Sequence, residues 1–136
     1  MTIEYPWNNE ENPNLGNIPK PIAEVGIKNS SGEWIRYILK IDSGASVTIL
    51  SFSDCSDLGY RYEDGEETYL GPLTGPQVKG RIHKLDLKLG GEILENVPIV
   101  FAERKLNDLL LGRKEIFTVF DIHLKGNLCK TVLERV

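Results

Sequence analysis

An Asp-Ser-Gly-Ala sequence between two apolar segments is the feature that most constrains how this chain can fold. Residues 34–40 before it have the character of a β-strand, and residues 46–50 after it are mostly β-branched and apolar. A carboxylate at the end of a buried strand is costly unless it is hydrogen-bonded. Gly44 allows the backbone to bend closely enough for amide N–H groups to point back at the Asp42 carboxylate. Ordinary turns also use Asp, Ser and Gly, so this motif alone leaves both a turn and a functional loop open.

A second apolar run, far downstream, also ends abruptly at a glycine. Three leucines from position 109 to Leu111 are followed by Gly112 and Arg113. The residues after them, 114–120, carry apolar side chains at helical spacing, which predicts one short helix. The side chains that this helix is expected to bury are Ile116, Phe117 and Phe120.

Together the two motifs resemble those of the retropepsin-like aspartic proteases, the single-lobe relatives of pepsin found in retroviruses and in many cellular proteins. The resemblance spans residues 21–134, and its parts fit in order and spacing. It implies an all-β fold, a closed, orthogonal, β-barrel-like single pepsin lobe with one short C-terminal helix and a flap hairpin. The protease domain would comprise residues 21–136. Residues 1–20, which are polar and rich in Asn, Glu and Pro, predict a flexible N-terminal arm.

The resemblance assigns roles to the first motif. Asp42 would be the catalytic residue. Ser43 would form a hydrogen bond across a dimer at the base of the site, and Gly44 would offer its N–H to the carboxylate. Ala45 fits the small residue that the family has at the fourth position of the motif.

The second motif would support the active-site loop through Leu111, Gly112 and Arg113. The usual partner of this arginine in retroviral-type members is an acid four positions after the catalytic Asp. Ser46 occupies that position here. This departure predicts either a looser dimer or an Arg113 that pairs with another acid.

Residues 69–80 predict a hairpin, because β-type residues flank a tip that is dense in Gly and Pro. In the family this is the position of the flap, which closes over a bound peptide. An ordinary long turn is the alternative, and the prolines predict a stiffer tip than glycine alone would give. The residues expected to contact substrate from the flap are Gly71, Pro72, Leu73, Thr74 and Gly75.

The remaining pattern predicts strands joined by short turns. Alternation of apolar and polar residues favours strands at 21–28, 35–41, 85–89 and 93–102, the third carrying Leu85, Leu87 and Leu89 on one face. Residues 51–60 predict a brief helical turn or loop. Pro98 indicates an edge strand or a bulge. The C-terminal residues 121–124 and 130–133 predict a hairpin around a Gly-Asn turn.

The length of the chain, 136 residues, suffices for one domain and is too short for two pepsin lobes. Because the sequence has only one Asp-Ser-Gly, a pepsin-type site would need a second copy of the chain. The resemblance therefore implies a homodimer that hydrolyses peptide bonds in a polypeptide substrate, through two Asp42 carboxylates and a water, with no metal or cofactor. The alternative is a catalytically silent module of the same fold that dimerises or binds peptides.

Composition narrows the other possibilities. A net charge of −4 without a basic cluster argues against nucleic-acid binding. No signal peptide and no apolar run of membrane-spanning length are visible, so we expect a cytoplasmic protein with no membrane association. Cys55 and Cys129 are expected to be two reduced thiols, with a disulfide as the alternative. His83 and His123 lack ligand-spaced partners and are predicted to be surface residues on strands.

Overall fold

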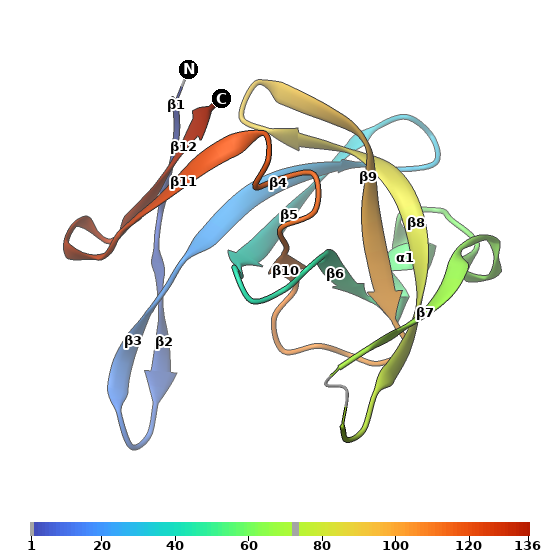
Figure 1. Ribbon diagram of the computed structural model, residues 1–136, viewed down its shortest axis with the longest axis horizontal. Coiled ribbons are helices and arrows are strands. Elements are labelled where there is room, and N and C mark those ends of the chain that lie inside the picture. The colour runs from blue at the N-terminus through green and yellow to red at the C-terminus, as the bar shows by residue number, and fades with distance from the viewer. Residues whose placement is uncertain (1, 72–73) are drawn as a thin grey trace.

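The computed structural model describes residues 2–71 and 74–136 of the chain (Figure 1). Pro72 and Leu73, two of the residues predicted for the flap, lie outside the described residues. The described chain is mostly β-strand, which confirms the predicted fold class. None of its helices has the length and apolar character needed to cross a membrane. In chain order the elements are β1 (Thr2–Pro6), β2 (Asn8–Asn12), β3 (Gly16–Lys20), β4 (Ile22–Lys28), β5 (Trp34–Ile41), β6 (Thr48–Ser51), α1 (Phe52–Asp57), η1 (Tyr62–Asp64), β7 (Glu66–Leu70), β8 (Val78–Leu89), β9 (Glu92–Ala102), β10 (Leu110–Leu111), β11 (Phe120–Lys125), η2 (Gly126–Leu128) and β12 (Lys130–Arg135).

The central sheet has the strand order β4-β5-β10-β6-β9-β8-β7, and an additional pairing of β4 with β8 curls it toward a closed barrel. The strand predicted for residues 21–28 is confirmed as β4, and its period of two places alternate side chains in the core. Inside the barrel the core contains fully buried side chains from several strands, among them Ala23, Val25, Ile27, Leu39, Leu50 and Phe101.

The hairpins predicted from local pattern are present. β7 and β8 pair antiparallel, with Leu70 opposite Val78, so the Gly- and Pro-rich segment joins two paired strands as expected. β8 and β9 form the longest hairpin, with an irregularity between Leu85 and Leu87. Pro98 lies near this bulge on β9, which is a central strand between β6 and β8 rather than an edge strand.

The first residues of the chain belong to a sheet. β1 pairs antiparallel with β12, and β12 pairs with β11, so the two ends of the chain lie side by side (Figure 1). The Tyr5 hydroxyl donates a hydrogen bond to the backbone oxygen of Glu24 in β4 over 3.1 Å. β2 and β3 form a separate hairpin that projects away from the body, with mostly exposed side chains. Composition predicted a loose terminus, but β1 is a paired strand. The flexibility of residues 1–20 as a whole and the division into an arm and a protease domain of residues 21–136 stay predictions.

The helix predicted for residues 114–120 is replaced by a series of turns. Two helix-like hydrogen bonds form, from the Phe117 N–H to the Arg113 oxygen and from the Phe120 N–H to the Ile116 oxygen. Glu115, however, has a φ of 66°, and a left-handed residue cannot continue a right-handed helix. Ile116 and Phe120 are buried as expected, whereas Phe117 is only half-buried, so the apolar spacing identified most of the buried face but not the backbone. The short helix of the fold is α1, within the segment that predicted a helical turn.

We expect Glu115→Gly to raise the free energy of unfolding by up to about 1 kcal/mol relative to Glu115→Ala, because glycine has no Cβ to strain at positive φ. In an α-helix the same comparison would lower the free energy of unfolding by about 1 kcal/mol. Urea unfolding followed by tryptophan fluorescence measures the sign. The alanine variant is the matched control, since both variants remove the ion pair of Glu115 with Lys114. A less stable glycine variant would show that this segment is helical.

Candidate active site

Asp42 directly follows the last residue of β5 and is held by the backbone of its own turn. β5 ends in the buried Ile41, whereas Asp42 is half-buried and Gly44 is exposed. The Gly44 N–H donates a hydrogen bond of 2.8 Å to Asp42 Oδ1, as the sequence predicted. The Ala45 N–H donates to the Asp42 backbone oxygen over 3.2 Å, which closes the turn. The carboxylate is therefore fixed through one oxygen, while the loop around it faces solvent.

The second motif lies directly against this turn, because β10 runs between β5 and β6. β10 is parallel to β5, with Leu111 opposite Ile41, and antiparallel to β6, with Leu110 opposite Ile49. The Asp42 N–H donates to the Leu111 oxygen over 3.1 Å. The fold thus brings together the two motifs that the sequence analysis identified, although a long stretch of chain separates them.

Gly112 packs against the backbone of the active-site loop. A Cβ at this position would lie only 2.2 Å from the Val47 carbonyl carbon, which no real side chain tolerates. The Gly112 N–H donates to Thr48 Oγ1 over 3.1 Å, and Thr48 is completely buried. This role of Thr48 was not predicted from the sequence. The available signal was a hydroxyl residue within an otherwise apolar segment.

Arg113 also holds the loop, through backbone oxygens. Its N–H donates to the Ala45 oxygen over 3.0 Å, and its guanidinium Nη1 donates to the Ser43 oxygen over 2.6 Å. Because Ser46 occupies the position of the usual acidic partner, Arg113 was expected to pair with another acid or to leave a looser dimer. The guanidinium instead binds a carbonyl of the active-site loop itself. Hydrogen bonds from a charged donor are stronger than neutral ones, so this contact tethers the loop without an ion pair.

A cleft of about 460 Å³ opens at Asp42. Loop residues 44–46 form one side, and Ile49 and Leu110 form an apolar wall. Leu70 and Gly71, at the end of β7, complete the lining, so the β7–β8 hairpin borders the site. Of the residues predicted for the flap, Gly71 lines the cleft, whereas Thr74 and Gly75 are exposed farther along the hairpin tip and do not line it. An apolar cleft with one fixed carboxylate suits an extended chain with apolar side chains and a polar backbone.

His83 is buried, which corrects the prediction that it lies on the surface. Its Nε2 lies 3.2 Å from the Tyr62 oxygen and 4.0 Å from the Cys55 sulfur. Its side chain shares the inward face of β8 with Leu85 and Leu87, so the alternation in the sequence already placed it inside. His123 lies on β11 with its side chain 48% exposed and follows the prediction.

The Cys55–His83 pair is a structural contact. Burial raises the pKa of the Cys55 thiol to about 11, with a smaller contribution from Glu63 and Asp64, so the thiol is protonated at neutral pH. Cys55 and Cys129 are both free thiols, as expected. Within residues 2–71 and 74–136, no three His, Cys, Asp or Glu side chains gather as they would around a metal ion.

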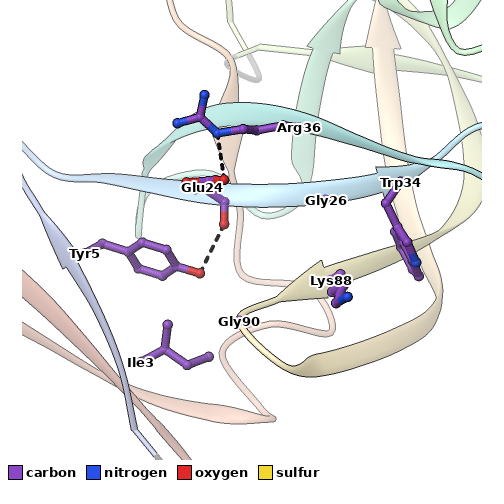
Figure 2. A pocket seen from close by; sticks show the side chains of 8 residues that line it. All are labelled: Ile3, Tyr5, Glu24, Gly26, Trp34, Arg36, Lys88 and Gly90. Atoms are coloured by element: carbon purple, nitrogen blue, oxygen red, sulfur yellow. Dashed lines mark hydrogen bonds and ion pairs between the residues drawn. The ribbon is translucent and has the colours of Figure 1, made fainter.

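A separate cavity of about 420 Å³ lies where β1 meets β4 and the β8–β9 turn (Figure 2). Its polar groups bind one another: the Tyr5 hydroxyl contacts the Glu24 backbone, and Arg36 Nε lies 2.6 Å from the Glu24 carboxylate. The Lys88 ammonium lies 5.8 Å from the centroid of the Trp34 ring, within cation–π range. These internal pairings describe a seam that joins β1 to the body, and the seam contains no free carboxylate comparable to Asp42.

Solved structures with the same fold are retropepsin-like proteases. A retropepsin-like aspartic protease from Rickettsia conorii superposes with a TM-score of 0.61 at 17% identity, over 95% of each chain. The EIAV protease, solved with the inhibitor HBY-793, gives a TM-score of 0.52 at 22% identity, over 69% of this chain and 82% of that one. Identities this low show the fold alone.

The chain belongs to the family described as gag-polyprotein putative aspartyl protease, whose profile matches residues 32–115, well over half of the chain. The match contains both motifs and the β7–β8 hairpin between them. No curated protein sequence matches the chain.

We expect Gly112→Ala to lower the free energy of unfolding by about 2–4 kcal/mol, because the new methyl group must displace the Val47 backbone. Gly91→Ala is the matched control, since a Cβ there meets no atom within 4 Å. The control should stay within about 0.5 kcal/mol of the parent protein. Chemical denaturation of both variants measures the difference, and equal effects would contradict the close packing of Gly112 against the loop.

Proposed function

We propose that the protein is an aspartic endopeptidase that acts as a homodimer, with one Asp42 from each chain. The observation that carries this proposal is the Asp42 carboxylate itself. It directly follows the buried Ile41 at the end of β5, receives the Gly44 N–H at 2.8 Å, and opens into an apolar cleft bordered by a hairpin. Membership of the aspartyl protease family supports the same chemistry.

A second chain is needed because one carboxylate cannot supply both a base and an acid at the same moment. The sequence offers a single Asp-Ser-Gly motif. Ser43 and Gly44 are exposed, so this face of the loop is available to another copy. In a two-fold dimer the same patch meets itself, and residues at the axis face their own counterparts. Asp42 would then lie beside the Asp42 of the second chain.

Two such carboxylates hold one proton between them, because like charges at close range cannot both ionise cheaply. The ionised Asp42 takes a proton from a water, whose oxygen attacks the carbonyl carbon of the peptide bond. The protonated Asp42 gives its proton to the carbonyl oxygen. The Asp42 that took a proton from water passes it to the peptide nitrogen, while the other Asp42 takes a proton from a hydroxyl of the tetrahedral intermediate. The C–N bond then breaks, an amine and a carboxylic acid are released, and the pair again holds one proton. The chemistry uses no metal, cofactor or covalent intermediate.

We further propose that the β7–β8 hairpin acts as a flap. Leu70 and Gly71 line the cleft beside Asp42, and Gly71 and Gly75 have positive φ values of 132° and 115°. Glycine adopts such conformations without steric cost, so both positions favour glycine. Closure over a bound peptide would exclude water other than the attacking molecule and align the peptide bond with the two carboxylates.

We expect the purified protein to cut a mixed library of denatured peptides between about pH 3 and 7, with a bell-shaped dependence on pH because both protonation states of the pair are required. Asp42→Asn should reduce the rate at least about a thousandfold. Mass spectrometry of the products measures both and reveals the preferred side chains around the cut.

Cleavage that persists in the Asp42→Asn variant would contradict the proposal. A folded dimer that binds peptides without cutting them, and binds them equally well with Asn at position 42, would instead support a catalytically silent peptide-binding module. Sedimentation of both variants establishes that they are folded and reports their oligomeric state.

A further inference from the structure

The cleft at Asp42 is the first of three hollows that follow one another across the surface. It shares Ile49, Leu70 and Leu110 with a second hollow of about 290 Å³. The second hollow shares Arg104 with a third, of about 600 Å³. The shared lining residues place the three hollows next to one another, and the row that they form, from the carboxylate to the segment after β9 and the start of α1, is here called the groove.

The third hollow contains an exposed aromatic side chain. Phe52, the first residue of α1, is 48% exposed. Its ring centroid lies 4.8 Å from that of Tyr62, in a tilted arrangement that fixes the position of the ring. Ser51 and Ser53 on either side also line the hollow. An exposed aromatic ring in a concave surface is a good contact for an apolar or aromatic side chain of a ligand.

Of the two acidic groups that line the second and third hollows, Asp108 has cationic partners, whereas Glu103 takes part in no ion pair among residues 2–71 and 74–136. Asp108, which lines the second hollow, forms an ion pair with Lys20 of β3, and Lys40 lies 4.0 Å from its other oxygen. Glu103 lies beside the hydroxyl of Tyr62. Burial of this hydroxyl and the nearby Glu103 carboxylate together raise the pKa of Tyr62 to about 12.

Two cations lie at the end of the groove that is farthest from Asp42. Arg104 and Lys105 are exposed and line the third hollow. Neither takes part in the ion pairs found among residues 2–71 and 74–136. Together with the Glu103 carboxylate, which lines the same hollow, Arg104 and Lys105 give this end of the groove a net charge of +1, on a chain whose net charge is −4.

The backbone that carries these cations is fixed at both ends. The Glu103 N–H donates to the Lys79 oxygen of β8 over 2.8 Å. The Leu106 N–H donates to Ser51 Oγ over 3.1 Å, which ties the segment to the start of α1. These two hydrogen bonds hold the backbone of residues 103–106 in place, with Arg104 and Lys105 beside Phe52. A recognition site needs side chains that are carried by a fixed backbone in this way.

We propose that Phe52, Arg104 and Lys105 form an exosite that binds the uncleaved flank of the polypeptide substrate and selects flanks with acidic side chains next to an apolar or aromatic one. The proposal rests on the proposed function, because the groove begins at the proposed catalytic carboxylate. An extended peptide advances about 3.3–3.6 Å per residue, so successive residues of the flank would follow the groove away from the cut. A two-fold dimer would carry one exosite for each end of the peptide, and an acidic flank on either side of the cut would be recognised.

Binding to the Asp42→Asn variant tests the exosite without turnover. The probes are three fluorescein-labelled peptides that share one apolar core and differ in the flank that follows it. The acidic flank contains Asp, Glu and Phe, the neutral flank contains Asn, Gln and Phe, and the basic flank contains Lys, Arg and Phe. We expect the acidic flank to bind about threefold to tenfold more tightly than the neutral one, the range given by two exposed charge pairs, and the basic flank to bind more weakly than both. The advantage should shrink as salt is raised.

Adding Arg104→Gln and Lys105→Gln should abolish the preference for the acidic flank while leaving affinity for the neutral flank unchanged. Lys84→Gln with Lys125→Gln is the matched control, because it makes the same change in net charge at exposed positions on β8 and β11 outside the groove. Phe52→Ala should weaken binding of all three peptides. Thermal unfolding verifies that each variant is folded.

Equal affinity for the three flanks, absence of measurable peptide binding, or a preference that survives loss of both cations would overturn the exosite. If the parent protein cuts the core peptide and all flanks bind equally, the exosite fails and the proposed function stands. If the acidic flank binds through Arg104 and Lys105 but the parent protein cuts nothing, the exosite stands and catalysis fails.

Discussion

The architecture of the site depends on a close backbone contact between two segments that are distant in sequence. β10 is only two residues long, yet the backbone oxygen of its Leu111 accepts a hydrogen bond from the Asp42 N–H. Gly112, directly after β10, donates its N–H to the Thr48 hydroxyl. The loop between β5 and β6 is thus held at both of its ends by one short strand. Because a Cβ at position 112 would collide with the Val47 backbone, the geometry around Asp42 depends on a glycine that takes no part in chemistry.

The loop is held in this way although Ser46 stands where the resemblance to retropepsin-like proteases implies an acid. Arg113 directs its guanidinium to the Ser43 carbonyl, 2.6 Å away, and so binds the loop without an ion pair. The site also differs from the other polar groupings described above. Glu24 and Arg36 satisfy each other, and Cys55 is a protonated, buried thiol, whereas Asp42 is open to a cleft. The proposed chemistry and exosite both follow from which charged groups remain unpaired.

The sequence predicted the features that depend on local pattern. Alternation of apolar and polar residues predicted β4, β9 and the end of β8, and the two glycine-terminated motifs predicted the candidate site. Both signals can be recognised because each lies within a few adjacent residues. The errors involve information that is not local. Apolar spacing after Arg113 predicted a helix, but a left-handed Glu115 turns the chain while Ile116 and Phe120 still reach the core. The pairing of β1 with β12, the role of Thr48 and the groove toward Phe52 arise only when distant segments meet, and no short pattern records them.

The central claim, that two copies of Asp42 form one site, is tested most directly by mixing the parent protein with increasing amounts of the Asp42→Asn variant and measuring peptide cleavage at a fixed total concentration after the subunits have exchanged. If each site needs an ionisable Asp42 from both chains, mixed dimers are inactive. Activity should then fall with the square of the fraction of parent protein. A linear fall would show that each chain works independently, and would contradict the shared site.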